Sequence, residues 1–181
     1  MIVVFDASVL VFLFDADASP PIDQATGESV TYCAERVTYL IAELQRAKAK
    51  IVIPAPALAE VLVYGGTAAP GWLRVLSTSR HIRITPFDQL AAIEFAEMER
   101  VRRGARPPEV SRAKAKFDQQ IVAIARLEGA DVIFSDDAHI RSLAPEPMIV
   151  RGVADLELAP AGRQAELIFD ADVNEAPSDD Q

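Results

Sequence analysis

The chain has 181 residues, half of them hydrophobic, which is enough for one domain with a sizeable core. Its net charge of −9 argues against a nucleic-acid partner unless the charge is unevenly distributed. The one cysteine, Cys33, can form no internal disulfide, and the sequence has no Cys and His cluster for a zinc site, so we expect a protein of the reducing cytoplasm.

The first predicted elements lie in the apolar segment MIVVFDASVLVFLFDADAS. No basic segment precedes its apolar run, and Asp6 interrupts that run. We therefore expect a core strand at Ile2–Phe5 followed by a short helix, and neither a signal peptide nor a membrane span.

Four more short apolar runs are typical of strands, and the segments between them have helical periodicity. The strands are predicted at Lys50–Ile53, Ile82–Thr85, Val132–Phe134 and Met148–Val150. The helices are predicted at Tyr32–Ala47, Ala57–Tyr64, Gly71–Ser77, Asp88–Arg103 and Ser111–Glu128. Two polar, proline-containing segments are predicted to be loops, Asp17–Ser29 and Gly104–Glu109. Strands that alternate with helices indicate an α/β fold with a parallel sheet covered on both faces.

The negative charge is concentrated in the last part of the chain. Residues Ala154–Gln181 contain eight acids and one base, a net charge of −7, whereas the preceding 153 residues have a net charge of −2. We therefore predict a folded domain at residues 1–153 and an acidic, flexible tail at residues 154–181.

Within the predicted domain, seven bases and one acid fall in a stretch of 17 residues. The bases are Arg100, Arg102, Arg103, Arg106, Arg112, Lys114 and Lys116. The stretch is either a solvated helix face and loop or a surface that contacts phosphates.

Acidic residues follow the predicted strands at the sheet edge where open α/β folds bind ligands. Asp6 and Ser8 follow the first strand, and Glu60 lies in the helix after the second. After the fourth strand come Ser135, Asp136 and Asp137. Each acid alone has a structural explanation, because Asp6 and Asp137 suit helix caps and Glu60 suits the first turns of a helix.

Asp118 is the most informative of the acids. It lies in the segment KFDQQIVAIA, on the same helix face as Ile121 and Ala125, where a buried apolar residue is expected. Two like charges at roughly 4 Å repel by about 1 kcal/mol in water and about 4 kcal/mol at an effective dielectric constant of 20. A cluster of Asp6, Glu60, Asp118 and Asp137 therefore needs protons or cations, and oxygen ligands alone suit Mg²⁺ or Mn²⁺.

The four segments VVFDASVL, PAPALAEVL, KFDQQIVAIA and VIFSDDAHI resemble the motifs of PIN-domain ribonucleases, the VapC-like toxins of type II toxin–antitoxin systems. The resemblance covers about residues 2–150. It implies a three-layer α/β/α fold with a five-stranded parallel sheet in the order 3-2-1-4-5. Two features depart from the family pattern, the long polar insertion at Asp17–Ser29 and the roughly 30 residues after the fifth strand, and both bear on the substrate and the partner.

The same resemblance implies a Mg²⁺- or Mn²⁺-dependent endoribonuclease. The catalytic and metal-binding residues would be Asp6, Glu60, Asp118 and Asp137. Ser8, Ser135 and Asp136 would hold these ligands or the substrate, and Arg112, Lys114 and Lys116 would bind the RNA backbone. The implied partners are RNA and a small antitoxin protein, and we expect a homodimer with no membrane association.

Other functions fit parts of the pattern. A PIN fold that only binds is an alternative to a nuclease. A phospho-acceptor signalling domain fits less well, because it needs a lysine after the last strand, where Arg151 and Gly152 stand. A phosphatase with an acidic nucleophile needs a second acid at Ser8. His81 and His139 are expected to be surface or strand-end residues, and Trp72 is expected in the core or in a dimer contact.

Overall fold

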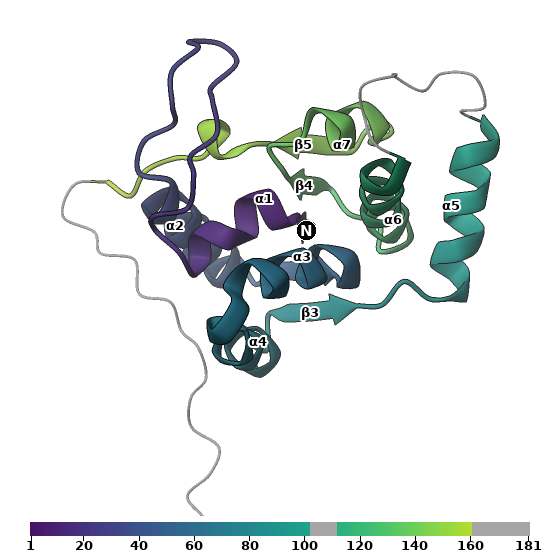
Figure 1. Cartoon of the computed structure of the whole chain (residues 1–181), viewed down its shortest axis with the longest axis horizontal. Coiled ribbons are helices and arrows are strands. Elements are labelled where there is room, and N and C mark those ends of the chain that lie inside the picture. Colours follow the sequence, from purple (N-terminus) through teal and green to yellow (C-terminus); the bar gives the residue numbers. More distant parts are fainter. Residues whose placement is uncertain (102–111, 161–181) are drawn as a thin grey trace, which may run out of the picture.

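Five parallel strands form the centre of the computed structural model, which describes residues 1–101 and 112–160 (Figure 1). The strands are β1 (Ile2–Phe5), β2 (Lys50–Pro54), β3 (Ile82–Thr85), β4 (Val132–Phe134) and β5 (Ile149–Arg151). They lie in the order β3-β2-β1-β4-β5, as the resemblance implied. β1, β3 and β4 have the predicted bounds, and β5 is shifted by one residue.

The central strand β1 is buried on both faces of the sheet, which explains why it is continuously apolar. In the central strand, Val3 and Phe5 lie in one hydrophobic cluster and Val4 lies in the other, because successive side chains point to opposite faces. All three side chains are fully buried. A β1 of this composition is stable only between two layers of helices.

The helices fall into two groups according to the cluster that they cover. They are α1 (Ala7–Leu10), α2 (Cys33–Arg46), α3 (Ala55–Gly65), α4 (Ala69–Thr78), α5 (Gln89–Val101), α6 (Arg112–Leu127) and α7 (Ala138–Leu143), with 3₁₀ turns η1 (Val11–Leu13), η2 (Gly66–Ala68) and η3 (Val153–Asp155). α1, α2 and α4 pack on the cluster of Val3 and Phe5, and α5, α6 and α7 pack on that of Val4. α3 contributes to both clusters, through Leu58 and Ala57 respectively. α3 therefore bridges the two layers.

The insertion predicted as a loop forms a small hairpin that projects beyond α1 and α2 (Figure 1). An antiparallel bridge joins Ile22 to Ser29, and the amide of Val30 donates to the carbonyl of Pro21 at 2.9 Å. The side chain of Asp23 closes the turn by accepting from the amide of Ala25 at 2.8 Å. Below, this segment is called the η1–α2 hairpin (residues 17–30).

The described chain continues into the core after β5. Val153 and Leu156 are buried in the cluster that contains Val3 and Phe5, and the guanidinium of Arg36 on α2 donates to the carbonyl of Leu156. The loop Gly104–Glu109 and most of the predicted acidic tail lie outside the described residues, so the domain boundary at residue 153 stays a prediction. None of the helices within the described ranges is both long and apolar enough to cross a membrane.

Three aromatic rings link η1, α3 and α4. Trp72 stacks on Phe14 with a centroid distance of 4.9 Å and lies 6.3 Å from the ring of Tyr64. Trp72 also packs against the hydrophobic core, in agreement with one of its two expected roles. A Cβ atom at Gly65 would lie 2.6 Å from ring atoms of Trp72. Glycine at residue 65 therefore allows Trp72 to approach α3.

Replacing Gly65 by Ala is expected to destabilise the fold by about 1–3 kcal/mol, because the indole must move away from α3. Gly71→Ala is the matched control. Gly71 lies on α4, and a Cβ atom there would have no neighbour within 4 Å, so alanine should raise stability by up to about 1 kcal/mol. Chemical denaturation of both variants measures the difference. Equal stability of the two variants would contradict the packing argument.

Candidate active site

Asp6 is fixed where β1 and β4 end side by side. The residue is 4% exposed, and its Oδ2 accepts hydrogen bonds from the hydroxyls of Ser8 at 2.7 Å and Ser135 at 2.8 Å. Each hydroxyl is in turn held by an amide: Asp136 N–H donates to Ser8, and Asp137 N–H donates to Ser135. The two serines, predicted to support the acids, thus hold Asp6 in one orientation.

Asp118 lies on the buried face of α6, as the sequence predicted, and is 5% exposed. Its Oδ2 lies 2.7 Å from Nδ1 of His139, the second residue of α7, which is 8% exposed. Burial raises the pKa of Asp118, and the hydrogen bond to His139 opposes that increase. The expectation that His139 is a surface or strand-end residue was wrong: it is buried in α7, because the buried carboxylate of Asp118 needs a hydrogen-bond donor.

Asp137 has two partners. Oδ1 accepts from the amide of His139 at 2.7 Å, which makes Asp137 the N-cap of α7, and Oδ2 forms a 2.7 Å ion pair with Nζ of Lys114 on α6. Burial works against ionisation of Asp137, but the bonds from Lys114 and from the amide of His139 lower its pKa overall. The cap explanation and the membership of the acidic cluster are therefore both correct for this residue.

Glu60 reaches the same place from α3. Partial burial, followed by repulsion from Asp6 and then Asp118, raises the pKa of its carboxyl group, although the residue as a whole is exposed. Asp137 adds to the repulsion and Lys114 reduces it. The four acids that were predicted from separate segments therefore interact electrostatically in the folded chain.

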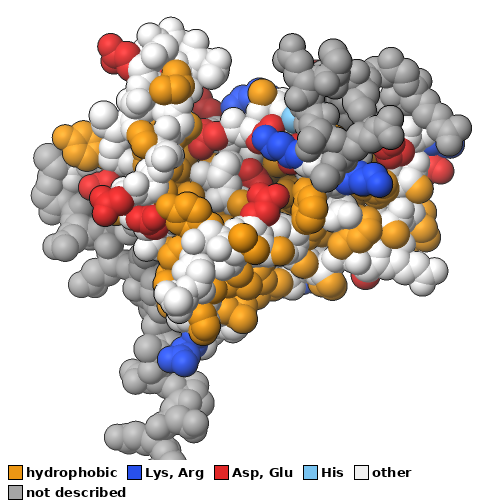
Figure 2. Space-filling view, in the orientation of Figure 1, with side chains coloured by type: hydrophobic (Ala, Val, Ile, Leu, Met, Phe, Trp, Pro, Cys, Tyr) orange, Lys and Arg blue, Asp and Glu red, His pale blue; other side chains and the backbone are white. Residues whose placement is uncertain are grey.

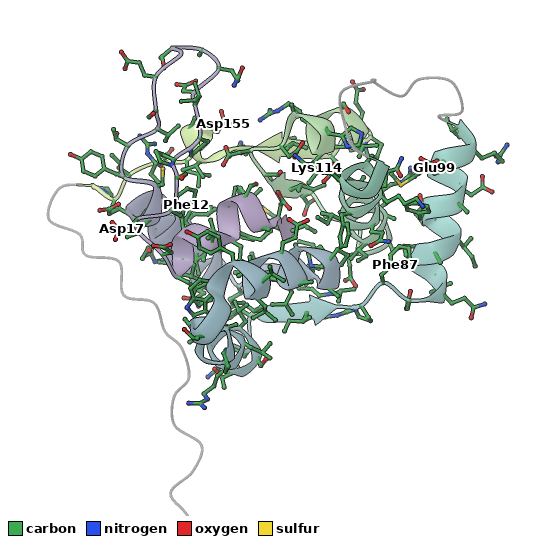
Figure 3. All side chains as sticks on the ribbon, in the orientation of Figure 1. Phe12, Asp17, Phe87, Glu99, Lys114 and Asp155 are labelled. Carbon is green, nitrogen blue, oxygen red and sulfur yellow. The ribbon has the colours of Figure 1, made fainter. Side chains whose placement is uncertain are left out.

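These residues line a pocket of about 430 Å³. Its charged residues and one serine are Asp6, Ser8, Glu60, Lys114, Asp118, Asp136 and Asp137. It is also lined by Ala7, Val11, Phe12, Ala18, Ser19, Pro21, Val61 and Tyr64, from α1, η1, the η1–α2 hairpin and α3. Figure 2 shows acidic side chains near the middle of this face, bordered by hydrophobic ones over α3 and α4. Figure 3 shows Lys114 on the side of α6 that faces α1.

Asp136 is turned toward the turn after β5. Oδ1 accepts from the amide of Val153 at 2.9 Å, and a Cβ atom at Gly152 would lie 2.3 Å from that oxygen. Oδ2 is buried and, in the described part of the chain, has no hydrogen-bond partner. Burial raises the pKa of Asp136, the bond from Val153 opposes this, and Asp6 adds to the increase.

The predicted RNA-binding bases are only partly described. Lys116 is exposed on α6, and Lys114 contacts Asp137 while 59% of its side chain stays exposed. The side chain of Arg112, and the bases at 102, 103 and 106, lie outside the described part of the structure. Lys114 is thus the one base of the stretch that the structure places at the pocket.

Comparison with known proteins identifies the fold. No family model and no curated protein sequence matches the chain. A chain of VapBC2 from Rickettsia felis, bound to a DNA fragment from their promoter, matches 84% of this chain and 98% of its own length, with a TM-score of 0.54 and 14% identity. The fold is that of a VapC-like PIN domain.

Two further VapC-like PIN structures match as well. One is VapC20 from Mycobacterium tuberculosis, a toxin that cleaves the sarcin–ricin loop, with a TM-score of 0.51, 14% identity and coverage of 77% of this chain and 93% of that one. The other is from VapBC-1 of nontypeable Haemophilus influenzae, with a TM-score of 0.53, 11% identity and coverage of 84% and 98%. At such low sequence identity, the similarity to these VapC structures concerns the fold alone.

The contact between His139 and Asp118 can be tested through stability. His139→Ala removes the donor to a buried carboxylate and is expected to destabilise the protein by about 1–3 kcal/mol. His81→Ala is the matched control, because His81 precedes β3 and should change stability by less than about 0.5 kcal/mol. Urea titration of both variants measures how much stability each substitution removes. A His139→Ala variant as stable as the control would show that Asp118 does not depend on this histidine.

Proposed function

We propose that the chain is a divalent-metal-dependent endoribonuclease that hydrolyses phosphodiester bonds in RNA and acts as the toxin of a toxin–antitoxin pair. The observation that carries the proposal is the shared pocket of Asp6, Glu60, Asp118 and Asp137, in which mutual repulsion contributes to the raised pKa of Glu60. A pocket with surplus negative charge favours a cation. The VapC-like PIN fold supports the same conclusion.

The donor set fits Mg²⁺ or Mn²⁺, because it consists of carboxylate oxygens. Within residues 1–101 and 112–160, no three His, Cys, Asp or Glu side chains are already arranged to hold a metal ion. Asp6 and Asp118 are the strongest candidates for direct ligands, with Glu60 and Asp137 completing the set. When bound, a divalent ion lowers the pKa of a coordinated water and stabilises negative charge on the attacked phosphate.

The residues around the acids have separate roles in this proposal. Ser8 and Ser135 keep one carboxylate oxygen of Asp6 oriented, and His139 does the same for Asp118. Lys114 contacts Asp137 and would turn to a phosphate when RNA enters. Lys116, exposed on α6, and Arg112 would attract the RNA backbone along the same helix.

The partners are part of the proposal. Two of the similar structures are VapBC assemblies, which supports a small antitoxin protein as the partner of this chain. We further propose that the protein forms a homodimer and acts in the cytoplasm. Co-expression of the chain with a small protein encoded beside it, followed by gel filtration, would test whether the two form a complex.

The activity itself is tested by incubating the purified chain with mixed cellular RNA in the presence of Mg²⁺, Mn²⁺ or EDTA. We expect cleavage with either metal and loss of cleavage in EDTA, because the pocket supplies oxygen ligands only. Cleavage that persists in EDTA would exclude the metal mechanism. Binding of RNA without cleavage in any buffer would favour the alternative, a PIN fold that only binds.

A further inference from the structure

Beside the acids, the pocket contains an exposed aromatic ring that the proposed hydrolysis does not use. We propose that Tyr64 is a stacking platform for an unpaired base of the nucleotide next to the scissile phosphate, so that the substrate is single-stranded RNA at this position. The inference rests on the proposed ribonuclease function. It adds a base-binding subsite to the phosphate-binding end of the pocket.

The geometry begins with the spacing of Glu60 and Tyr64. They are four residues apart on α3, so their side chains project from the same face of the helix about 5–6 Å apart at Cβ. Both line the same pocket. A ligand whose phosphate lies near Glu60 and the other acids therefore has Tyr64 within the reach of its own base.

The ring of Tyr64 is exposed but held in place. Its residue is 55% exposed, while its hydroxyl donates to Oδ2 of Asp15 at 2.6 Å. Trp72 lies beside the ring at an interplanar angle of 28°, and Trp72 itself stacks on Phe14 at 10°. A fixed aromatic ring loses little conformational freedom when a base stacks on it, which favours binding.

The charges of the pocket orient a nucleotide in one direction. Lys114 lies with Asp118 and Asp137 at one end, where a phosphate and its cations belong. At the Tyr64 end, the nearest polar partner of the ring is the carboxylate of Asp15, which repels phosphate and accepts hydrogen bonds from base amino groups. The neutral part of the nucleotide, its base, is therefore favoured over Tyr64.

The walls of the pocket also suit a base. Phe12, Ala18, Pro21 and Val61 line the same pocket as Tyr64 and the acids, and give it apolar walls. Bases within an RNA duplex are stacked on one another and paired, whereas bases of single strands and loops can turn outward onto an aromatic side chain. The subsite thus selects RNA that is unpaired beside the bond to be cut.

The test compares two probes that differ only in their bases. One is a short single-stranded oligoadenylate, and the other is an abasic ribose–phosphate chain of the same length. Their dissociation constants are measured with the full chain carrying Asp6→Asn, so that the RNA is not cut, and with the same chain carrying in addition Tyr64→Ala, Tyr64→Phe or Tyr32→Ala. Tyr32 is the matched control, because it is 62% exposed and does not line the pocket.

Tyr64→Ala is expected to weaken binding of oligoadenylate about 5- to 140-fold, which corresponds to the stacking of one base, and to leave binding of the abasic chain nearly unchanged. Tyr64→Phe retains the ring and should stay within about 3-fold of the parent protein, as should Tyr32→Ala. Equal weakening of both probes by Tyr64→Ala would mean that the residue acts on the phosphates or on the fold, and would overturn the subsite.

The result also separates the subsite from the proposed function. If wild-type protein cleaves RNA with Mn²⁺ but Tyr64→Ala binds oligoadenylate as tightly as the parent, the subsite is wrong and the ribonuclease function stands. If the wild type neither binds nor cleaves single-stranded RNA, both proposals are wrong. Cleavage of a hairpin RNA in its loop but not in its stem is the expected outcome when both are correct.

Discussion

Replacing Asp6 by Asn is expected to reduce RNA cleavage at least about 10³-fold, since a metal ligand supplies several kcal/mol of transition-state stabilisation. The fold should stay intact, because the amide oxygen of Asn can still accept the hydrogen bonds that Ser8 and Ser135 donate to Asp6. Initial rates of cleavage with Mn²⁺, together with a melting curve, measure both quantities.

Asp131→Asn is the matched control for this variant. Asp131 precedes β4, so it lies at the other end of the sheet from Asp6, and its carboxylate accepts from the amide of Ile2 at 2.8 Å. The control variant should cleave RNA within about 3-fold of the wild type. If Asp6→Asn cleaves as fast as the control, the acids of the pocket are structural and do not bind a catalytic ion.

The second large effect is that a divalent metal ion should reverse which of two proteins, the wild type or Glu60→Gln, is the more stable. A divalent ion at 100 times its dissociation constant should stabilise the wild type by about 2.7 kcal/mol. The same ion should stabilise Glu60→Gln much less, because the neutral amide is a weaker ligand than the carboxylate. In EDTA the order of stability of the two proteins is expected to reverse. Glu60→Gln should then be the more stable protein, by less than about 1 kcal/mol, because solvent screens an exposed carboxylate.

The EDTA difference has a defined pH dependence. The pKa of Glu60 is raised in the folded protein, so its ionised form destabilises the fold above that pKa. As the pH falls through the raised pKa to the ordinary value for glutamate, the folded state takes up the proton first and the wild type approaches the variant. Melting curves at neutral and acidic pH measure this convergence.

Glu35→Gln provides the comparison for both conditions. Glu35 is an exposed acid in the first turn of α2 and does not line the pocket. Its replacement should neither stabilise the protein in EDTA nor change its response to Mn²⁺. If Glu60→Gln behaves like Glu35→Gln in both buffers, the raised pKa of Glu60 has no bearing on metal binding.

The strands could be predicted from sequence because their signal is local. β1 and β4 are short apolar runs that end at polar residues, and a parallel sheet buried on both faces leaves that pattern. α7 was not predicted as a separate helix, because its six residues are too few to show a helical period. The long helices were placed to within a few residues, as α2 at Cys33–Arg46 illustrates.

That the four acids share one pocket could also be predicted, but their partners could not. Asp118 was noticeable because a carboxylate occupied an apolar face, yet its partner His139 lies 21 residues away on another helix. The one available signal was that a buried carboxylate needs a donor, and His139 lies two residues after Asp137 in the motif. The pairing of Lys114 with Asp137 and the position of Tyr64 likewise depend on how α3, α6 and α7 meet.

The η1–α2 hairpin forms part of the pocket wall and could be exchanged for another segment. Ala18, Ser19 and Pro21 line the pocket, but only Ala18 and Val30, at the base of the hairpin, are buried in the core. Surface segments accept changes in length and sequence at small cost in free energy, because few packed contacts depend on them. A segment of different length grafted between Ala18 and Val30 would reshape the pocket while leaving the acids untouched. In the proposed ribonuclease, the acids that would cut and the wall that would select the substrate therefore lie on separate segments, which makes this hairpin a starting point for redesigning selectivity.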